Sequence, residues 1–447
     1  MSGVDLPVGR PPALGIAVLS AGAGWEPALL PLLDDPTVGL HLVRRCVDVA
    51  ELLAVATAGS VRVAIVDAGA PRVDRETVDR LRRAGVCTLL VEAARGDGRA
   101  PVDLGAADLV GADEPPATLV GRARAIATTP ARGWSAAAPT PASLTPAPPA
   151  PGDPRGRLVV VWGPGGAPGR STVAVNLATE LSRRGRGVLL VDADAAGGAV
   201  GTMLGVTDDA PGVAAACRSA LRGRLDPEVL AGLAVALDPG LRLLTWTSRP
   251  DRWRELRPSA LAVLWDACRA LADDVVVDVA PGLAGDEPDP LEPMLVGPSA
   301  ATRSALEAAD LVLAVGAADP LGLLRLVQGL DVLAETAATG PPDLVLNRVR
   351  AGTAGYRPRR QVREVVGRFV DTEPLAYLPD DPRATDAALR AGRALADAAP
   401  SSALRRAVQA LAAALDPATG PLTRMPVGPG HGRRRRVRAS TGLRSGA

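Results

Sequence analysis

The sequence contains no lysine, and arginine supplies all 50 of the basic residues among its 447. An arginine where lysine is usual therefore reflects the usage of the whole chain as well as the chemistry of that position. The 49 acidic residues leave a formal net charge of +1. Such a balance gives no overall attraction to nucleic acid or membrane, so contacts of that kind would require a local basic patch.

Cysteine and histidine are also scarce. The four cysteines include no C-x-x-C pair, which argues against a zinc site, an iron–sulfur cluster or a disulfide framework; they are Cys46, Cys87, Cys217 and Cys268. A reduced, cytoplasmic compartment is expected. The two histidines, His41 and His431, lie far apart in the sequence, so histidine catalysis is not expected.

Aromatic residues make up only 2% of the chain although hydrophobic residues make up 47%, so alanine, valine and leucine must build the cores. The length favours two domains. Charged residues break the apolar runs well short of the ~20 residues that a membrane span requires. The N-terminus lacks a basic region followed by an apolar core, so we expect no signal peptide.

Alternating short strands and helices predict an α/β protein with two doubly wound parallel-sheet domains. We place the first domain at residues 14–127 and the second, with more than six strands, at 157–415. A Pro/Ala-rich linker at 128–156 should join them. Residues 1–13 and 416–447 show no period and are expected to be disordered.

The tail from residue 416 contains an arginine cluster, Arg433–Arg438, with no apolar face beside it. One interpretation is a solvated tail. The other is weak contact with acidic lipid headgroups at the membrane surface or with DNA phosphates. Both stay open.

The first domain resembles the receiver domain of response regulators in its five strand–helix units. Asp67, which ends the third strand in VAIVDAG, matches the position where a receiver is phosphorylated. The first strand is followed by SAGAG, without the acidic pair that would hold Mg²⁺, and the last by GADEP, without a lysine. Such a site has little to stabilise a moving phosphoryl group. We therefore favour a degenerate receiver kept for protein contacts over one phosphorylated at Asp67.

A phosphate-binding loop is predicted in LVVVWGPGGAPGRSTVAVN, residues 158–176. An apolar strand leads into a glycine-rich turn, and a helix opens at Ser171 and Thr172, so backbone amides and the helix dipole can face an anion. The glycines of the turn are Gly163, Gly165, Gly166 and Gly169. The loop is one residue longer than G-x-x-x-x-G-K-[ST] and carries Arg170 in place of its lysine.

Carboxylates follow two other apolar strands of the second domain. Asp192 and Asp194 end VLLVDADAAGG, and Asp278 ends the strand in DDVVVDVAPGL. Beside a phosphate-binding loop such groups can hold a metal-bound water or the attacking water. A single aspartate at a strand end usually caps the next helix, but two such strands after one loop favour a nucleotide site.

The motifs PGGAPGRSTVAVNLA, LLVDADAAGG, VVVDVAPG, DLVLAVGAADPLGLLRL, VLNRV and LPDDPRATDAALRAGRAL together resemble the MinD/ParA class of P-loop ATPases over nearly the whole second domain. With a degenerate receiver in front, the chain looks most like the CpaE/TadZ branch, which is linked to the positioning of pilus or secretion machinery. The resemblance implies ATP and Mg²⁺ as cofactors. It also implies a nucleotide-dependent homodimer and a protein partner for the receiver-like domain.

The resemblance assigns roles residue by residue. The glycines of the loop, with Arg170, Ser171 and Thr172, would hold the phosphates, and Asp192, Asp194 and Asp278 would be the catalytic acids. Mg²⁺ would be held by Ser171, Asp192 and Asp278. The base or ribose would contact Asn347, Arg348 and the stretch from Pro379 to Asp381.

Two departures from the class bear on hydrolysis. The early lysine that reaches across an ATP-sandwiched dimer is replaced by Pro164 or a neighbour, and Arg170 stands where the second lysine is expected. A planar guanidinium is not a neutral substitute for an ammonium, and loss of one such electrostatic contact costs ~10²–10³ in rate. An alternative is that Arg170 points to solvent and has no role.

The sequence thus favours a nucleotide-dependent positioning or assembly scaffold at pilus or secretion machinery or at a division site, with weak or absent ATP hydrolysis. One alternative is a ParA-type chromosome-partitioning ATPase that binds DNA non-specifically, but no helix-turn-helix precedes the ATPase motifs. The other is a biosynthetic enzyme on the same fold, but no cluster of catalytic Lys, His or Cys lies near the loops.

Overall fold

The computed structural model describes residues 14–20, 22–93, 103–128, 155–166, 168–206, 212–246, 250–283, 297–336, 340–354, 356–370 and 373–416. The predictions for residues 1–13, for most of the linker (129–154) and for the tail from residue 417, including Arg433–Arg438, lie outside this part of the chain. We call residues 14–128 the N-terminal unit and residues 155–416 the C-terminal unit.

The N-terminal unit is a five-stranded parallel sheet with the strand order β2-β1-β3-β4-β5. Its elements are β1 (Leu14–Leu19), α1 (Glu26–Leu33), β2 (Leu40–Cys46), α2 (Val49–Thr57), β3 (Val63–Asp67), α3 (Arg75–Arg83), β4 (Cys87–Glu92), β5 (Asp108–Gly111) and α4 (Pro116–Thr128). Helices α2 and α3 begin where the side chains of Asp48 and Asp74 accept hydrogen bonds from the amides of Glu51 and Thr77. The strand order is the doubly wound order shared by flavodoxin-like folds.

The C-terminal unit is an eight-stranded sheet with the order β13-β12-β11-β6-β10-β7-β9-β8. Its strands are β6 (Arg157–Trp162), β7 (Val188–Ala193), β8 (Val235–Asp238), β9 (Leu241–Leu244), β10 (Asp274–Val279), β11 (Leu311–Ala317), β12 (Asp343–Val349) and β13 (Ala376–Pro379). The prediction of α/β architecture with parallel sheets is confirmed. The sequence pattern missed β8, an edge strand antiparallel to β9, because it is short and half-exposed and so shows no apolar run.

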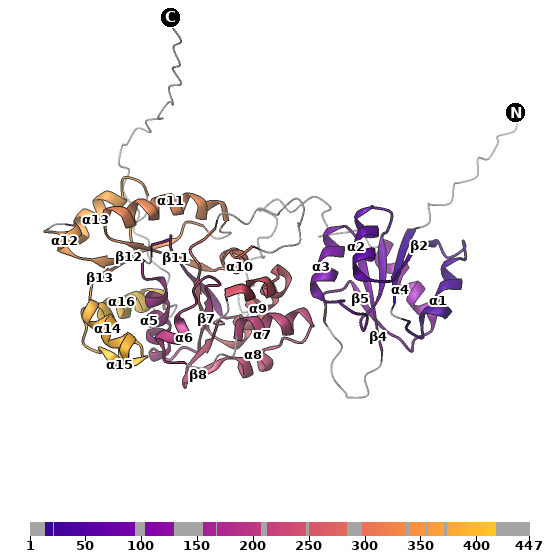
Figure 1. Ribbon diagram of the computed structural model, residues 1–447, viewed down its shortest axis with the longest axis horizontal. Coiled ribbons are helices and arrows are strands. Elements are labelled where there is room, and N and C mark those ends of the chain that lie inside the picture. Colours follow the sequence, from indigo (N-terminus) through magenta and orange to yellow (C-terminus); the bar gives the residue numbers. More distant parts are fainter. Residues whose placement is uncertain are drawn as a thin grey trace, which may run out of the picture.

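Helices cover both faces of this sheet. They are α5 (Arg170–Arg183), α6 (Val200–Met203), α7 (Gly212–Leu221), α8 (Pro227–Leu233), the 3₁₀ helix η2 (Pro250–Glu255), α9 (Pro258–Leu271), α10 (Ala300–Ala308), α11 (Pro320–Thr336), α12 (Ala351–Ala354), α13 (Pro358–Val366), α14 (Pro382–Ala391), α15 (Leu395–Ala398) and α16 (Ala403–Leu415). Figure 1 shows α5 and α14 to α16 on one side of β7 and α7 to α10 on the other. None of the helices within the described ranges combines the length and apolar character that a membrane span needs.

The central strand β6 contributes alternate side chains to two separate cores. Leu158, Val160 and Trp162 pack with residues of α7, α9 and α10, whereas Val159 and Val161 pack with residues of α5 and α16. All five are buried. Burial on both faces is typical of a central strand of a parallel sheet, and the carboxyl end of such a strand lies at the sheet edge where the following loop begins.

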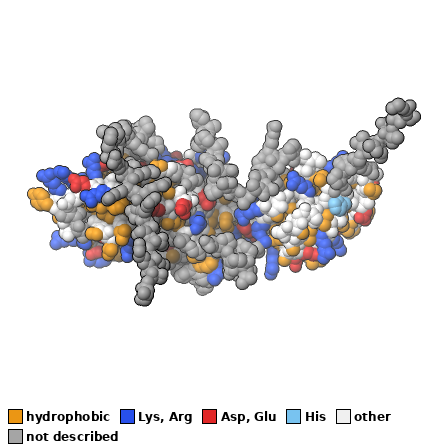
Figure 2. All heavy atoms as spheres, turned by 90° about the horizontal axis from the view of Figure 1, so that it is seen from above, with side chains coloured by type: hydrophobic (Ala, Val, Ile, Leu, Met, Phe, Trp, Pro, Cys, Tyr) orange, Lys and Arg blue, Asp and Glu red, His pale blue; other side chains and the backbone are white. Residues whose placement is uncertain are grey.

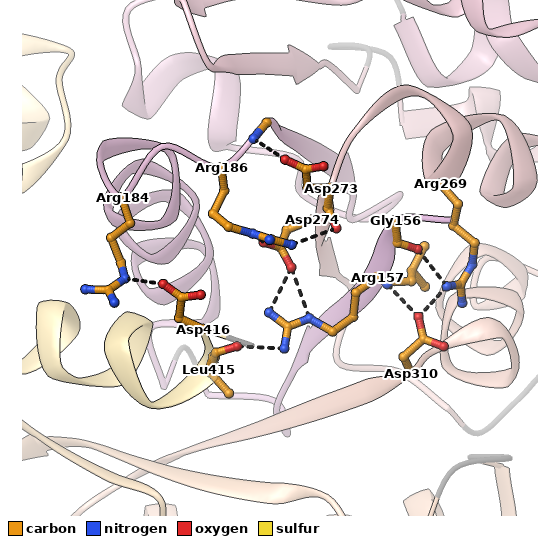
Figure 3. Close-up of polar contacts among 12 residues, drawn as sticks. Gly156, Arg157, Arg184, Arg186, Arg269, Asp273, Asp274, Asp310, Leu415 and Asp416 are labelled. Carbon is orange, nitrogen blue, oxygen red and sulfur yellow. Dashed lines mark hydrogen bonds and ion pairs between the residues drawn. The ribbon is translucent and has the colours of Figure 1, made fainter. Parts of the chain in front are cut away.

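A network of ion pairs closes the opposite edge of the sheet, where β6 and β10 begin (Figure 3). The buried carboxylate of Asp274 accepts hydrogen bonds from Arg157 (Nε at 3.0 Å, Nη2 at 2.8 Å) and from Arg186 (Nε at 2.6 Å). Arg157 also donates to the carbonyl oxygen of Leu415 at 2.7 Å, and Arg184 pairs with Asp416 at 2.8 Å. The network therefore joins the end of α16 to the first strand of the unit.

The two units meet through α3 of the first and α7 and α9 of the second. The Ser259 hydroxyl donates a hydrogen bond to Oε2 of Glu76 at 2.7 Å. A cleft of about 1310 Å³ opens beside this contact, lined by both units. On the face shown in Figure 2, arginine and acidic side chains of the described residues are interspersed, as the small net charge would suggest.

Candidate functional site

The glycine-rich loop joins the carboxyl end of β6 to the amino end of α5, as the sequence predicted. Two of its glycines are required by their surroundings. A Cβ at Gly163 would overlap the carbonyl oxygen of Val315 on β11, and Gly169 has a φ of +98° with the amide of Asn347 against it. Any other residue would separate the loop from its neighbours or strain the backbone. The loop is thus held against β11 and β12.

Arg170 does not point to solvent, so the alternative prediction of a solvent-directed side chain is wrong. Its side chain is 11% exposed, and Nη1 donates to the carbonyl oxygens of Gly163 (3.1 Å) and Pro164 (3.2 Å). Nη2 lies 3.5 Å from Oδ2 of Asp194. The guanidinium therefore lies within the loop and is held by its own carbonyls and by one carboxylate.

Two aspartates lie side by side below the loop. Asp192 on β7 and Asp278 on β10 are register partners in neighbouring parallel strands, and both are buried. Burial, and then the charge of Asp278, raises the pKa of Asp192 well above its ordinary value. Burial also raises the pKa of Asp278 to about 7, although the Ser171 hydroxyl and the Arg170 guanidinium act in the opposite direction.

The three acids differ in their hydrogen bonds. Asp192 accepts from the amides of Asp194 (3.3 Å) and Val200 (3.1 Å). Asp194 accepts at Oδ1 from the amides of Ala196 and Gly197, both at 3.0 Å. Among the described residues, no group reaches either carboxylate oxygen of Asp278 with hydrogen-bond geometry. Asp278 is therefore the buried acid without a geometric hydrogen bond, although the nearby Ser171 hydroxyl and Arg170 guanidinium favour its ionised form.

A pocket of about 370 Å³ lies at the other end of the loop. It brings together the five residues predicted to contact the base or ribose with Gly169 of the loop and Thr172 of α5. The five are Asn347, Arg348, Pro379, Asp380 and Asp381. Asn347 donates from Nδ2 to the carbonyl oxygen of Pro168 at 2.8 Å, and Asp381 caps α14 by accepting from the amide of Ala384. Each therefore has a structural task as well.

Other residues of this region escaped the sequence analysis. Asp319, Arg350 and Thr385 also line the pocket, and the guanidinium of Arg325 on α11 lies against Gly166. The position of Arg325 depends on how α11 packs beside β6, and no local pattern reports that.

A family model matches part of this region. The model for ParA, described as NUBPL iron-transfer P-loop NTPase, matches residues 155–235. These residues are thus similar to a ParA-type P-loop segment. The matched segment contains β6, the loop, α5 and β7, and so includes Arg170, Asp192 and Asp194. Asp278 and the pocket at Asn347 lie beyond it, so their assignment rests on the geometry described above.

Several solved structures are similar to the chain. A ParA family ATPase from Chlorobium tepidum TLS is 21% identical with a TM-score of 0.49, and the match covers 59% of this chain and 100% of that chain. The cell division ATPase MinD of Pyrococcus furiosus is 21% identical with a TM-score of 0.46, covering 58% and 97%. MinD of Pyrococcus horikoshii, complexed with Mg-ADP, is 19% identical with a TM-score of 0.46, covering 59% and 97%. A comparison with curated proteins finds no match.

Proposed function

We propose that this protein binds ATP in the manner of MinD/ParA proteins and acts as a nucleotide-dependent positioning or assembly scaffold, with slow or absent hydrolysis. The observation that carries the proposal is the loop after β6. Its glycines and the helix that follows them suit a phosphate-binding site, but its arginine is bound to the loop's own carbonyls and to Asp194. A guanidinium held in this way is poorly placed to follow charge that develops on a leaving phosphate.

The acids below the loop support Mg²⁺ as the companion ion. Asp278 has two buried carboxylate oxygens without a hydrogen-bond partner in the described residues, and Asp192 adds a second buried carboxylate beside it. Within the part of the chain that the structure describes, no group of three or more acidic, histidine or cysteine side chains forms a metal site by itself. Mg²⁺ bound with nucleotide takes one or two protein carboxylates and completes its shell with phosphate and water oxygens, so Asp278, Asp192 and the Ser171 hydroxyl fit it.

The pocket at Asn347 supports an adenine nucleotide of ordinary size. Its volume of about 370 Å³ lies within the range of small-molecule sites. It opens beside Gly169 and Thr172, so a base in the pocket would adjoin phosphates bound at the loop. In this proposal Arg348, Pro379 and Asp381 hold the base or ribose. The binding of ATP then shifts the populations of the conformations that the segments after Asp194 and Asp278 adopt. This shift changes the surface offered to a partner or to a second copy of the chain.

The N-terminal unit is proposed to be a degenerate receiver-like domain that docks a protein partner, as in the CpaE/TadZ branch. Its strand order is the one that receiver domains share with flavodoxin-like folds. Asp67 ends β3 and accepts from the amide of Gly69 at 2.9 Å. The iron transfer named in the matched model is not extended to this chain, because its four free cysteines are all buried.

The test measures ATP affinity and turnover of the purified protein, alone and with DNA or anionic liposomes. We expect binding with turnover below about 0.01 per second, at least a hundredfold under the low end of ordinary enzyme rates. Failure to bind ATP would disprove the proposal, and DNA-stimulated turnover would favour a partitioning ATPase instead. Arg170→Lys should keep ATP binding and raise turnover. If it loses binding, the guanidinium itself holds the phosphates.

A further inference from the structure

Arg325 of α11 places a second guanidinium at the loop. A Cβ added to Gly166 would overlap one terminal nitrogen of Arg325, and Gly166 has a φ of +105°. The residue at this position must therefore lack a side chain for the arginine to lie where it does. Arg325 is exposed, and within the described residues no hydrogen bond or ion pair of its guanidinium is present.

The backbone of Arg325 is fixed although its side chain is exposed. Its helix begins just after β11, the neighbour of β6, and Oδ1 of Asp319 accepts from the amide of Gly322 at 2.8 Å in the first turn. Leu323 and Leu326, on either side of Arg325, are buried in the core. The long side chain is therefore presented to the loop from a rigid base.

The two arginines of the loop have different surroundings. Arg170 is nearly buried and is engaged by Gly163, Pro164 and Asp194. Within the described residues the donors of Arg325 have no partner, and its guanidinium lies at Gly166, whereas the pocket proposed for the base opens at Gly169, at the other end of the loop. A nucleotide with its base in that pocket would extend its phosphates toward Arg325.

We propose that Arg325 binds the terminal phosphate of a nucleoside triphosphate held by this loop and so makes the site selective for the triphosphate over the diphosphate. The inference rests on the proposed function, since it requires that the loop binds ATP. A guanidinium presents a planar set of N–H donors that matches two phosphate oxygens at once. In a chain without lysine, such a helix-borne arginine can supply the cation that the loop's own arginine does not offer.

The experiment compares ATP and ADP affinities of wild-type protein, Arg325→Gln and Arg325→Lys, by displacement of a fluorescent adenine nucleotide in the presence of Mg²⁺. Arg325→Gln should weaken ATP about tenfold to a hundredfold, as expected for one or two charge-assisted hydrogen bonds, and ADP less than about threefold. The ATP affinity of Arg325→Lys should lie between those of the wild type and Arg325→Gln. The matched control is Arg368→Gln, which removes another exposed arginine of the same unit and should change neither affinity.

Each outcome decides the matter. Unchanged ATP affinity in Arg325→Gln, or equal weakening of ATP and ADP, would overturn the assignment to the terminal phosphate. Tighter ATP binding would show that Arg325 only covers the loop. If the wild-type protein binds neither nucleotide, the proposed function fails as well, whereas a wild type that binds ATP beside an unaffected Arg325→Gln variant rejects this inference alone. Circular dichroism of the variants checks that they are folded.

Discussion

Two buried carboxyl groups, those of Asp192 and Asp278, lie on adjacent strands and share one low-dielectric space. The pKa of each is raised, first of all by burial. Because a buried charge is costly unless it is paired, the folded protein without a bound cation favours protonation of this pair. Ionisation of the two acids in the folded protein therefore costs free energy unless a cation is bound.

This cost of ionisation predicts that the free energy of unfolding depends on pH. The pKa of Asp278 is about 7 in the folded protein and ~3.9 when unfolded, so protonation favours the folded state. The contribution is fully present below about pH 4 and is lost as the pH rises through 7. Between pH 5 and 8, Mg²⁺-free wild-type protein should lose about 2 kcal/mol of unfolding free energy more than Asp278→Asn, as measured by urea denaturation.

Two controls accompany that measurement. Asp386→Asn removes an exposed carboxylate of α14 and should keep the wild-type pH dependence. Added Mg²⁺ should stabilise the wild type more at pH 8 than at pH 5, because it binds the ionised acids. Parallel pH curves for wild type and Asp278→Asn would show that Asp278 does not carry this charge.

For single residues, the sequence pointed to the acids of the site but not to the contacts that they make. Strand-end aspartates after a glycine-rich loop predict a site, and the register that pairs Asp192 with Asp278 agrees with it. The engagement of Arg170 could not be predicted, because its partners Gly163 and Asp194 reach it only through the fold. Arg325 escaped for the same reason.

Among the elements, β6 and β10 are fastened at their amino ends by Asp274. This carboxylate is fully buried and takes hydrogen bonds from Arg157 and Arg186, whose side chains are 24% and 27% exposed. A buried acid in such a setting is not a source of extra stability by itself, since its desolvation offsets the attraction. Its removal, however, leaves two partly buried guanidinium groups without their partner.

We therefore expect Asp274→Ala to lower the unfolding free energy by about 3 kcal/mol. Tryptophan fluorescence during urea unfolding would measure the change. Glu364→Gln is the control, because its pair with Arg360 lies within one helix and is 54–67% exposed, and it should cost less than about 0.5 kcal/mol. A loss below 1 kcal/mol for Asp274→Ala would mean that water solvates the arginines in its place.

The long elements were predictable and the short ones less so. The apolar runs of β6, β7 and β10 mark central strands, as the sequence predicted. Edge strand β8 carries only two half-buried positions, too few to produce a recognisable period. The capping residues Asp48 and Asp74 lie at positions typical of helix starts.

For the whole molecule, the contact between the units is the feature that no local pattern could predict. It joins α3 to α9 through Glu76 and Ser259. The boundaries proposed for the domains and for the linker stay predictions. The contact itself can be tested by chemistry that does not depend on the function.

Glu76→Cys combined with Ser259→Cys should allow a short bifunctional maleimide to join the two units in most molecules. The native thiols should stay unreactive, because all four are buried and burial raises the pKa of Cys46 to about 11 and of Cys217 to about 12. Peptide mass spectrometry would detect the bridge. A double variant of Glu76→Cys with Ser401→Cys, on the exposed turn before α16, should give none. Equal yields would mean that the contact does not persist in solution.

The hydrogen bond between Arg157 and the carbonyl oxygen of Leu415 bears on how the chain could be reconnected. It brings the first strand of the C-terminal unit to the end of its last helix, at the sheet edge opposite the glycine-rich loop. Because the two ends of this unit lie close together, we expect its fold to tolerate circular permutation and insertion into another protein. A protein fused at either end would therefore lie at the edge of the sheet opposite the glycine-rich loop.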